Sequence, residues 1–109
     1  PGDRRDQDII ALGSVAGKGF HRLIIKEDEN LRGRSSGEVA SLLAKGALDA
    51  GLKRDKIDVI LREEEAITKS LVNAIEGDLI IIFYENYEKS LNAIKDAVAR
   101  INRALVLPV

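Results

Sequence analysis

The 109-residue chain has no cysteine, no methionine and no tryptophan, and only two prolines. Without cysteine, neither a disulfide framework nor a thiolate metal site can form, which fits a reducing compartment, and we predict a cytoplasmic protein. The missing methionine, and a start at Pro1 in a charged loop, lead us to expect a piece of a longer protein.

The chain also lacks an excess of charge of either sign and any long apolar run. Its net charge is −1, so we predict no general electrostatic binding to nucleic acid or to an anionic membrane. No apolar stretch approaches the roughly 20 residues that a membrane helix requires. Any recognition by this protein must therefore be local.

What the sequence does contain is an alternation of helical and extended patterns within a length that suits one domain, residues 1–109. Apolar residues at helical spacing alternate with short apolar runs, and glycines stand between them. The pattern predicts helices around residues 9–16, 39–50, 67–75 and 91–101, and strands at 22–26, 57–61 and 78–84. Ser35 or Ser36 is expected to cap the second helix. Residues 104–109 would form an edge strand or dock on the domain.

This order predicts an α/β fold with three layers: a mostly parallel sheet with helices on both faces. The run at 78–84, DLIIIFY, is nearly continuously apolar, as in a central parallel strand. We expect the first strand of this fold to lie before Pro1 and to be absent from the chain. An exposed sheet edge would then favour pairing between copies, so a homo-oligomer is one expected partner.

Three polar loops would meet at the carboxyl edge of such a sheet, where ligands bind in open α/β folds. The first loop, residues 1–6, carries Asp3, Arg4 and Arg5 directly before a helix. Backbone N–H groups and guanidinium forks there suit a phosphate or carboxylate. The alternative is a solvated loop whose charges pair with each other, because no complete nucleotide-binding motif is present.

The second loop, residues 27–37, places Arg32 and Arg34 on either side of Gly33. An arginine fork grips a carboxylate through two hydrogen bonds, and the glycine permits a turn that aims the two side chains differently. The alternative is an ordinary surface loop in which these arginines pair with Glu27, Asp28 or Glu29.

The third loop, residues 83–90, presents Tyr84, Glu85 and Glu88 after the most apolar run. The carboxylates could hold a cationic amine or guanidinium, and the tyrosine could stack on it. The alternative is that Asn86 caps the next helix, with the two glutamates as acidic residues near its first turn.

No catalytic residue and no metal site are predicted. The single histidine, His21, has no recognisable nucleophile or metal partner in the sequence, so we expect no hydrolysis by this chain alone.

Three segments taken together, GDRRDQDI, IIKEDENLRGRSSGEVASLL and GDLIIIFYENYE, resemble the C-terminal domain of the Mur-type amide ligases, over residues 1 to about 95. The likeness is strongest to the branch that joins arginine to the side-chain carboxylates of a poly-aspartate backbone. The resemblance implies a central P-loop domain, absent here, that binds ATP and Mg²⁺, and a C-terminal domain that closes over it and helps to hold the amino acid. That central domain and the amino acid are therefore the expected partners, and the isolated chain should be inactive.

The resemblance also implies residue roles. Arg32 takes the place of the arginine in the family's DNPR motif, which binds a substrate carboxylate, although Leu31 replaces the proline. Glu88, with Glu85 as the alternative, takes the place of the glutamate in a GHE motif and would face the guanidinium of arginine. The first loop matches the family's loop toward ATP, so Arg4 or Arg5 would approach the nucleotide.

Two alternatives remain beside this interpretation. One is a Mur-type ligase that adds another amino acid, such as diaminopimelate, lysine or glutamate. The other is a non-catalytic α/β interaction module that keeps the scaffold without the partner domains.

Overall fold

The structure is a computed structural model, and it describes residues 4–106. The chain divides between Leu61 and Arg62 into two compact units, each of which is described by itself.

The first unit is built around two parallel strands. Helix α1 (Asp6–Gly19) precedes β1 (Leu23–Ile25), and α2 (Glu38–Asp49) leads through a short 3₁₀ turn, η1 (Arg54–Lys56), to β2 (Ile57–Val59). The strands pair with Leu23 opposite Ile57 and Ile25 opposite Val59. The predicted strands at 22–26 and 57–61 and their parallel pairing are thus confirmed, and the unit has an α/β fold.

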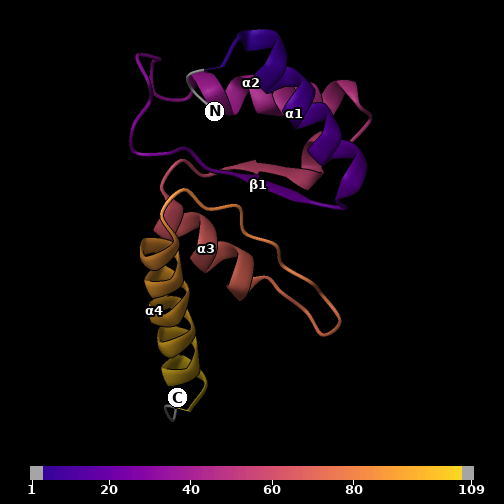
Figure 1. Cartoon of the computed structure of the whole chain (residues 1–109). Coiled ribbons are helices and arrows are strands. Elements are labelled where there is room, and N and C mark those ends of the chain that lie inside the picture. The colour runs from indigo at the N-terminus through magenta and orange to yellow at the C-terminus, as the bar shows by residue number, and fades with distance from the viewer. Residues whose placement is uncertain (1–3, 107–109) are drawn as a thin grey trace. The chain divides into compact units, whose positions relative to one another are not determined.

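Helices α1 and α2 pack against each other on one face of these two strands (Figure 1). Glycines allow their backbones to touch: a Cβ atom at Gly46 would lie 1.9 Å from the carbonyl oxygen of Ile10, and one at Gly13 would lie 2.1 Å from that of Leu43. Any larger residue would have to push the helices apart. The core of the unit consists of Ile9, Ile25, Val39, Ala40 and Ala47, all buried.

The second unit contains α3 (Glu63–Val72) and α4 (Tyr87–Val106), which pack side by side. Ala66 and Ile67 of α3 and Ala97 of α4 are buried. Ser90 is also buried, and its hydroxyl donates a hydrogen bond of 2.9 Å to Glu63 Oε1. The four predicted helices are therefore present.

Residues 78–84 are not a strand in this structure, contrary to the prediction from their apolar sequence. Leu79 is 84% exposed and Phe83 is 71% exposed. The physical reason is that a strand needs a hydrogen-bonded neighbour, and the second unit provides no strand within its described residues. The predicted three-layer sheet is thus reduced to two strands, with both helices of the first unit on one face.

Two smaller predictions also need correction. Gly37, in the left-handed conformation at φ 87°, is the residue that precedes α2, so neither Ser35 nor Ser36 is its N-cap. Residues 104–106 continue α4 and do not start an edge strand, and the remainder of that prediction, 107–109, lies outside the described residues.

Within residues 4–106, no helix combines the length and the apolar character that a membrane crossing demands.

Candidate functional site

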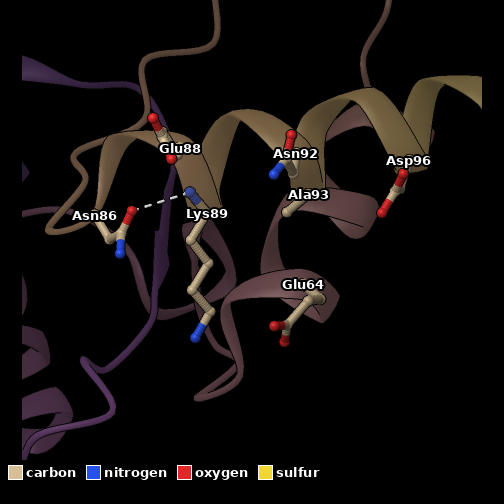
Figure 2. Close-up of a pocket in the computed structure, with 7 residues that line it drawn as sticks. All are labelled: Glu64, Asn86, Glu88, Lys89, Asn92, Ala93 and Asp96. Atoms are coloured by element: carbon tan, nitrogen blue, oxygen red, sulfur yellow. Dashed lines mark hydrogen bonds between the residues drawn. The ribbon is translucent and has the colours of Figure 1, made fainter.

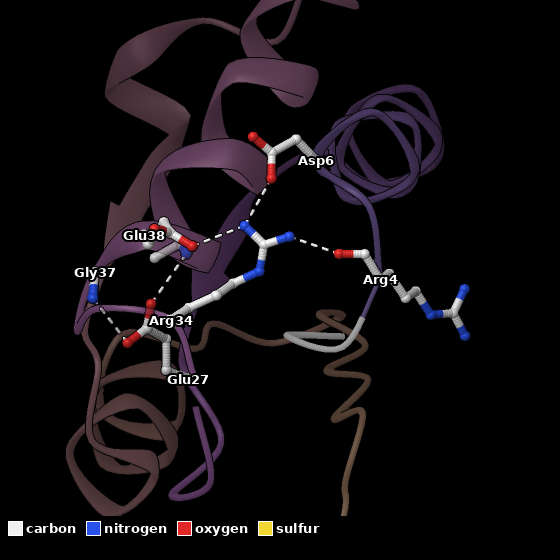
Figure 3. A network of polar contacts seen from close by, with 7 residues as sticks. Arg4, Asp6, Glu27, Arg34, Gly37 and Glu38 are labelled. Carbon is white, nitrogen blue, oxygen red and sulfur yellow. Dashed lines mark hydrogen bonds and ion pairs between the residues drawn. The ribbon is translucent and has the colours of Figure 1, made fainter. Parts of the chain in front are cut away.

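The side chain of Arg34 joins three segments of the first unit (Figure 3). Its Nη1 atom lies 2.7 Å from Asp6 Oδ1 and 2.7 Å from Glu38 Oε2, and its Nη2 atom donates to the carbonyl oxygen of Arg4 at 2.5 Å. The side chain is 16% exposed. The hydrogen bonds that Arg34 donates to Asp6 and Glu38 raise the pKa of Arg34 above its ordinary value. These contacts tie the second loop to the first loop and to the start of α2.

Arg32 lies two residues earlier, in a tight turn. Its backbone has a positive φ of 55°, followed by Gly33 at φ 85°. The turn is held on one side by the Arg32 N–H, which donates to Asn30 Oδ1 at 3.0 Å, and on the other by the Arg34 N–H, which donates to the Leu31 carbonyl at 3.0 Å. A positive φ is unfavourable for a residue with a Cβ atom. The turn therefore presents Arg32, which is exposed, in a defined conformation.

Glu27 caps the N-terminus of α2 from a distance in the sequence. Its Oε1 accepts a hydrogen bond from the Gly37 N–H at 2.9 Å, and its Oε2 accepts one from the Ala40 N–H at 3.1 Å (Figure 3). A carboxylate there satisfies two N–H groups that have no partner inside the helix and complements the helix dipole. Glu27 thereby fixes the second loop at the end of β1 to the start of α2.

In the first loop, Arg4 and Arg5 are exposed, and Asp3 lies outside the described residues. Arg5 Nε lies 3.0 Å from Asp8 Oδ2, and its Nη2 lies 3.2 Å from Asp8 Oδ1. This hydrogen-bonded pair lowers the pKa of Asp8 and raises that of Arg5. The guanidinium of Arg4 points away from the network around Arg34 (Figure 3). Arg5 thus pairs with an acidic residue of α1, and Arg4 contributes its carbonyl to the network around Arg34.

The third loop leads into α4 with the predicted helix cap. Asn86 Oδ1 accepts a hydrogen bond from the Lys89 N–H at 3.1 Å. The rings of Tyr84 and Tyr87 meet edge to face, with 5.4 Å between their centroids. Both rings are more than half exposed. The structural role assigned to Asn86 is therefore confirmed, and it does not exclude a binding role for its neighbours.

Glu88 lines a shallow, open hollow of about 420 Å³ between α3 and α4 (Figure 2). Glu64 and Asp96 are the other acidic residues that line it. A wall rich in carboxylate and amide oxygens can accept hydrogen bonds from a cationic group. Glu85 and Tyr84 do not belong to the lining. The remaining lining residues are Asn86, Lys89, Asn92 and Ala93.

The structure brings some of the predicted site residues together and leaves others apart. In the first unit, Arg34 contacts the backbone of Arg4, and Arg32 lies in the adjoining turn. In the second unit, Glu88 lies in the hollow, while Glu85 lies outside its lining. The roles of these residues toward a substrate or a nucleotide remain predictions.

Sequence reasoning missed the partners that hold Arg34 and α2 in place. Glu38 stands four residues after Arg34, a spacing that predicts a contact only when both residues lie on one helix. Here Arg34 lies before α2 and Glu38 is its first residue, and the two side chains still form an ion pair. Asp6 lies 28 positions from Arg34, and Glu27 lies ten positions before Gly37. Separations of this kind leave no local signal in a sequence.

Among the residues that the structure describes, no group of three or more carboxylate, imidazole or thiol side chains could hold a metal ion.

The fold and these loops define a small α/β module with arginines gathered beyond the end of a parallel strand. The chain is 44% identical over 95 residues to a protein named cyanophycin synthetase from Synechocystis sp., which is 87% of this chain and 11% of that protein. It is 43% identical over 94 residues to a cyanophycin synthetase from Crocosphaera subtropica and 44% identical over 95 residues to one from Geminocystis herdmanii, with 11% of each protein covered.

The chain thus spans about a ninth of the length of these relatives and is similar to one region of them. No protein-family profile matches the chain, and no solved structure matches it either.

Proposed function

We propose that this chain is the C-terminal domain of an ATP-dependent amide ligase similar to cyanophycin synthetase and that it helps to bind the incoming arginine. The observation that carries the proposal is the identity of 43% to 44% to three cyanophycin synthetases over 86% to 87% of the chain. Such identity over nearly the whole chain supports a shared fold and a shared position in a longer enzyme.

In the proposed reaction, a side-chain carboxylate of a poly-aspartate backbone is activated as an acyl phosphate at the expense of ATP. The α-amine of arginine attacks the acyl carbon, and a tetrahedral intermediate collapses with loss of phosphate to leave an isopeptide bond. ATP and Mg²⁺ would be held mainly by a central domain elsewhere in the longer protein. This chain would supply binding and closure and no catalytic group.

The proposed residue roles follow chemistry. Arg32 would bind the α-carboxylate of arginine, because a guanidinium fork matches a carboxylate with two parallel hydrogen bonds. Glu88, with Glu85 as the alternative, would accept hydrogen bonds from the arginine guanidinium, and Tyr84 would stack on it. With both ends of the substrate bound in this way, its α-amine would be left to attack.

The first loop would contact the nucleotide through Arg4 or Arg5, with Asp3 beside them. These arginines stand directly before α1, whose N-terminal N–H groups favour anions. Arg5 would have to exchange its bond to Asp8 for a phosphate. The side chains of Arg5 and Asp8 are 72% and 45% exposed, so breaking their ion pair costs little free energy.

The proposed fold is the three-layer arrangement with residues 78–84 as a strand of a parallel sheet. The alternate apolar residues 79, 81 and 83 are all exposed, and the least exposed of them, Ile81, is 52% exposed. Such a row of exposed apolar side chains supports the proposal that this segment is buried in the complete enzyme. The proposal includes an intracellular location for the enzyme.

The proposal is tested with the longer protein that contains this chain. Labelled arginine, lysine, diaminopimelate and glutamate are offered separately, with ATP, Mg²⁺ and an aspartate-chain primer. We expect ATP-dependent incorporation of arginine at least tenfold above the other amino acids. Preference for another amino acid would contradict the substrate and favour a different Mur-type ligase, and absence of any incorporation would favour a non-catalytic module.

A further inference from the structure

The guanidinium of Arg34 is occupied by protein groups that come from opposite sides of the second loop. One nitrogen bridges two carboxylates, from the first residue of α1 and the first residue of α2, and the other bonds the Arg4 carbonyl (Figure 3). Only the planar guanidinium of an arginine can donate to three acceptors placed in this way. The ammonium of a lysine is a compact charge and cannot reach all three from one position. Arg34 therefore fixes the first loop relative to the second.

The backbone N–H of Arg34 closes the turn that presents Arg32. Arg32 and Gly33 both have positive φ, and this turn ends at Arg34. A non-glycine residue at positive φ persists only where its surroundings hold it. Arg34 provides that support, because its backbone N–H bonds the turn and its side chain is anchored to two helices.

We propose that Arg34 is a positioning residue that couples the two ligand-binding loops, and this inference rests on the proposed function in taking Arg32 as the carboxylate-binding residue and the first loop as the nucleotide-facing loop. Arg34 touches neither ligand. Loosening it would disorder the turn around Arg32 and release the first loop at Arg4, so the affinities for arginine and for ATP would fall together. A residue that contacts only the amino acid would alter one of them.

The test is steady-state kinetics of the full-length enzyme with Arg34→Lys. We expect KM to rise at least fivefold for arginine and at least threefold for ATP, with kcat within twofold of the wild type. Arg22→Lys is the matched control, because Arg22 also bonds a carbonyl and pairs with a carboxylate, at the other end of β1. That control should leave both KM values within 1.5-fold.

Asp6→Asn adds a second test of the same contact. Since Asp6 and Arg34 share one hydrogen bond, the double variant should raise KM by about as much as the more severe single variant, and not by the product of the two effects. Multiplicative effects, or an Arg34→Lys enzyme with both KM values unchanged, would overturn the inference.

A readout that needs no turnover separates this inference from the proposed function. Hydrogen exchange of the full-length enzyme should show faster exchange at residues 5–9 and 31–37 in Arg34→Lys, with residues 42–48 of α2 unchanged. If the wild type incorporates no arginine, the proposed function fails and exchange still reports on Arg34. Unchanged exchange at both segments, or faster exchange throughout α2, would overturn the role of Arg34 as a local positioning residue.

Discussion

Arg32 and Arg34 stand two residues apart in the second loop and have different surroundings. Arg34 is bound to three protein groups and is largely enclosed, whereas Arg32 is exposed in a turn with positive φ. Their spacing in the sequence made both arginines candidates, and only the family resemblance singled out Arg32. The difference depends on Asp6, which is distant in sequence, and spacing alone does not reveal such a partner.

At the residue scale we predict that Glu27 stabilises the first unit. In the 109-residue chain, Glu27→Ala should lower the free energy of unfolding by about 1 to 2 kcal/mol, as for the loss of a helix cap with two hydrogen bonds. The measurement is urea denaturation followed by circular dichroism. The expected loss arises because the Gly37 and Ala40 N–H groups would lose their acceptor in a half-buried position.

Glu76→Ala serves as the control for Glu27→Ala, because Glu76 is an exposed glutamate in the turn after α3. It should change the unfolding free energy by less than about 0.5 kcal/mol. Equal midpoints for the two variants would show that the cap contributes nothing measurable.

At the element scale, the helices were predictable because their signals are local. Apolar residues at helical spacing located α1, α2, α3 and α4, with boundaries that differ by a few residues. The parallel pairing of β1 with β2 followed from the helix between them. The close approach of α1 to α2 was not predicted, although Gly13 and Gly46 enable it, since a glycine inside a helix carries no information about its partner.

The segment 78–84 shows where local reasoning stops. Its apolar run indicates burial, and burial of a strand requires backbone partners that are remote in sequence. Within the structure it is irregular, and alternate side chains such as Leu79 and Phe83 are exposed. Residues 78–84 can therefore form a β-strand only if another part of the protein provides partners for their backbone hydrogen bonds.

We predict that residues 79–83 are paired as a strand in the full-length enzyme. Their amides should exchange at least a hundredfold more slowly than the unprotected rate, as expected for amides in a sheet ladder. The measurement is hydrogen exchange with mass spectrometry, and residues 28–31 of the second loop, which are not in a helix or strand, provide an internal comparison. Exchange of residues 79–83 at the rate of that loop would contradict the proposed strand.

At the scale of the whole molecule, the chain corresponds to about a ninth of the relatives that it resembles. Among its described residues, no three or more carboxylate, imidazole or thiol side chains gather where they could hold a metal ion. The sequence was sufficient to identify the loops that carry the arginines. The structure adds the hydrogen bonds and ion pairs that hold these loops in place. The binding of an amino acid to those loops would also involve other domains, so it has to be tested in the full-length enzyme.

The central claim, that this chain binds the incoming arginine, is tested most directly by the KM for arginine of the full-length enzyme with Arg32→Ala. Loss of a charge-assisted contact worth about 1.5 to 3 kcal/mol should raise that KM by roughly tenfold or more, with the KM for ATP within twofold of the wild type. Arg22→Ala should leave both values within twofold. An unchanged KM for arginine in Arg32→Ala, with arginine still incorporated by the wild type, would contradict the claim.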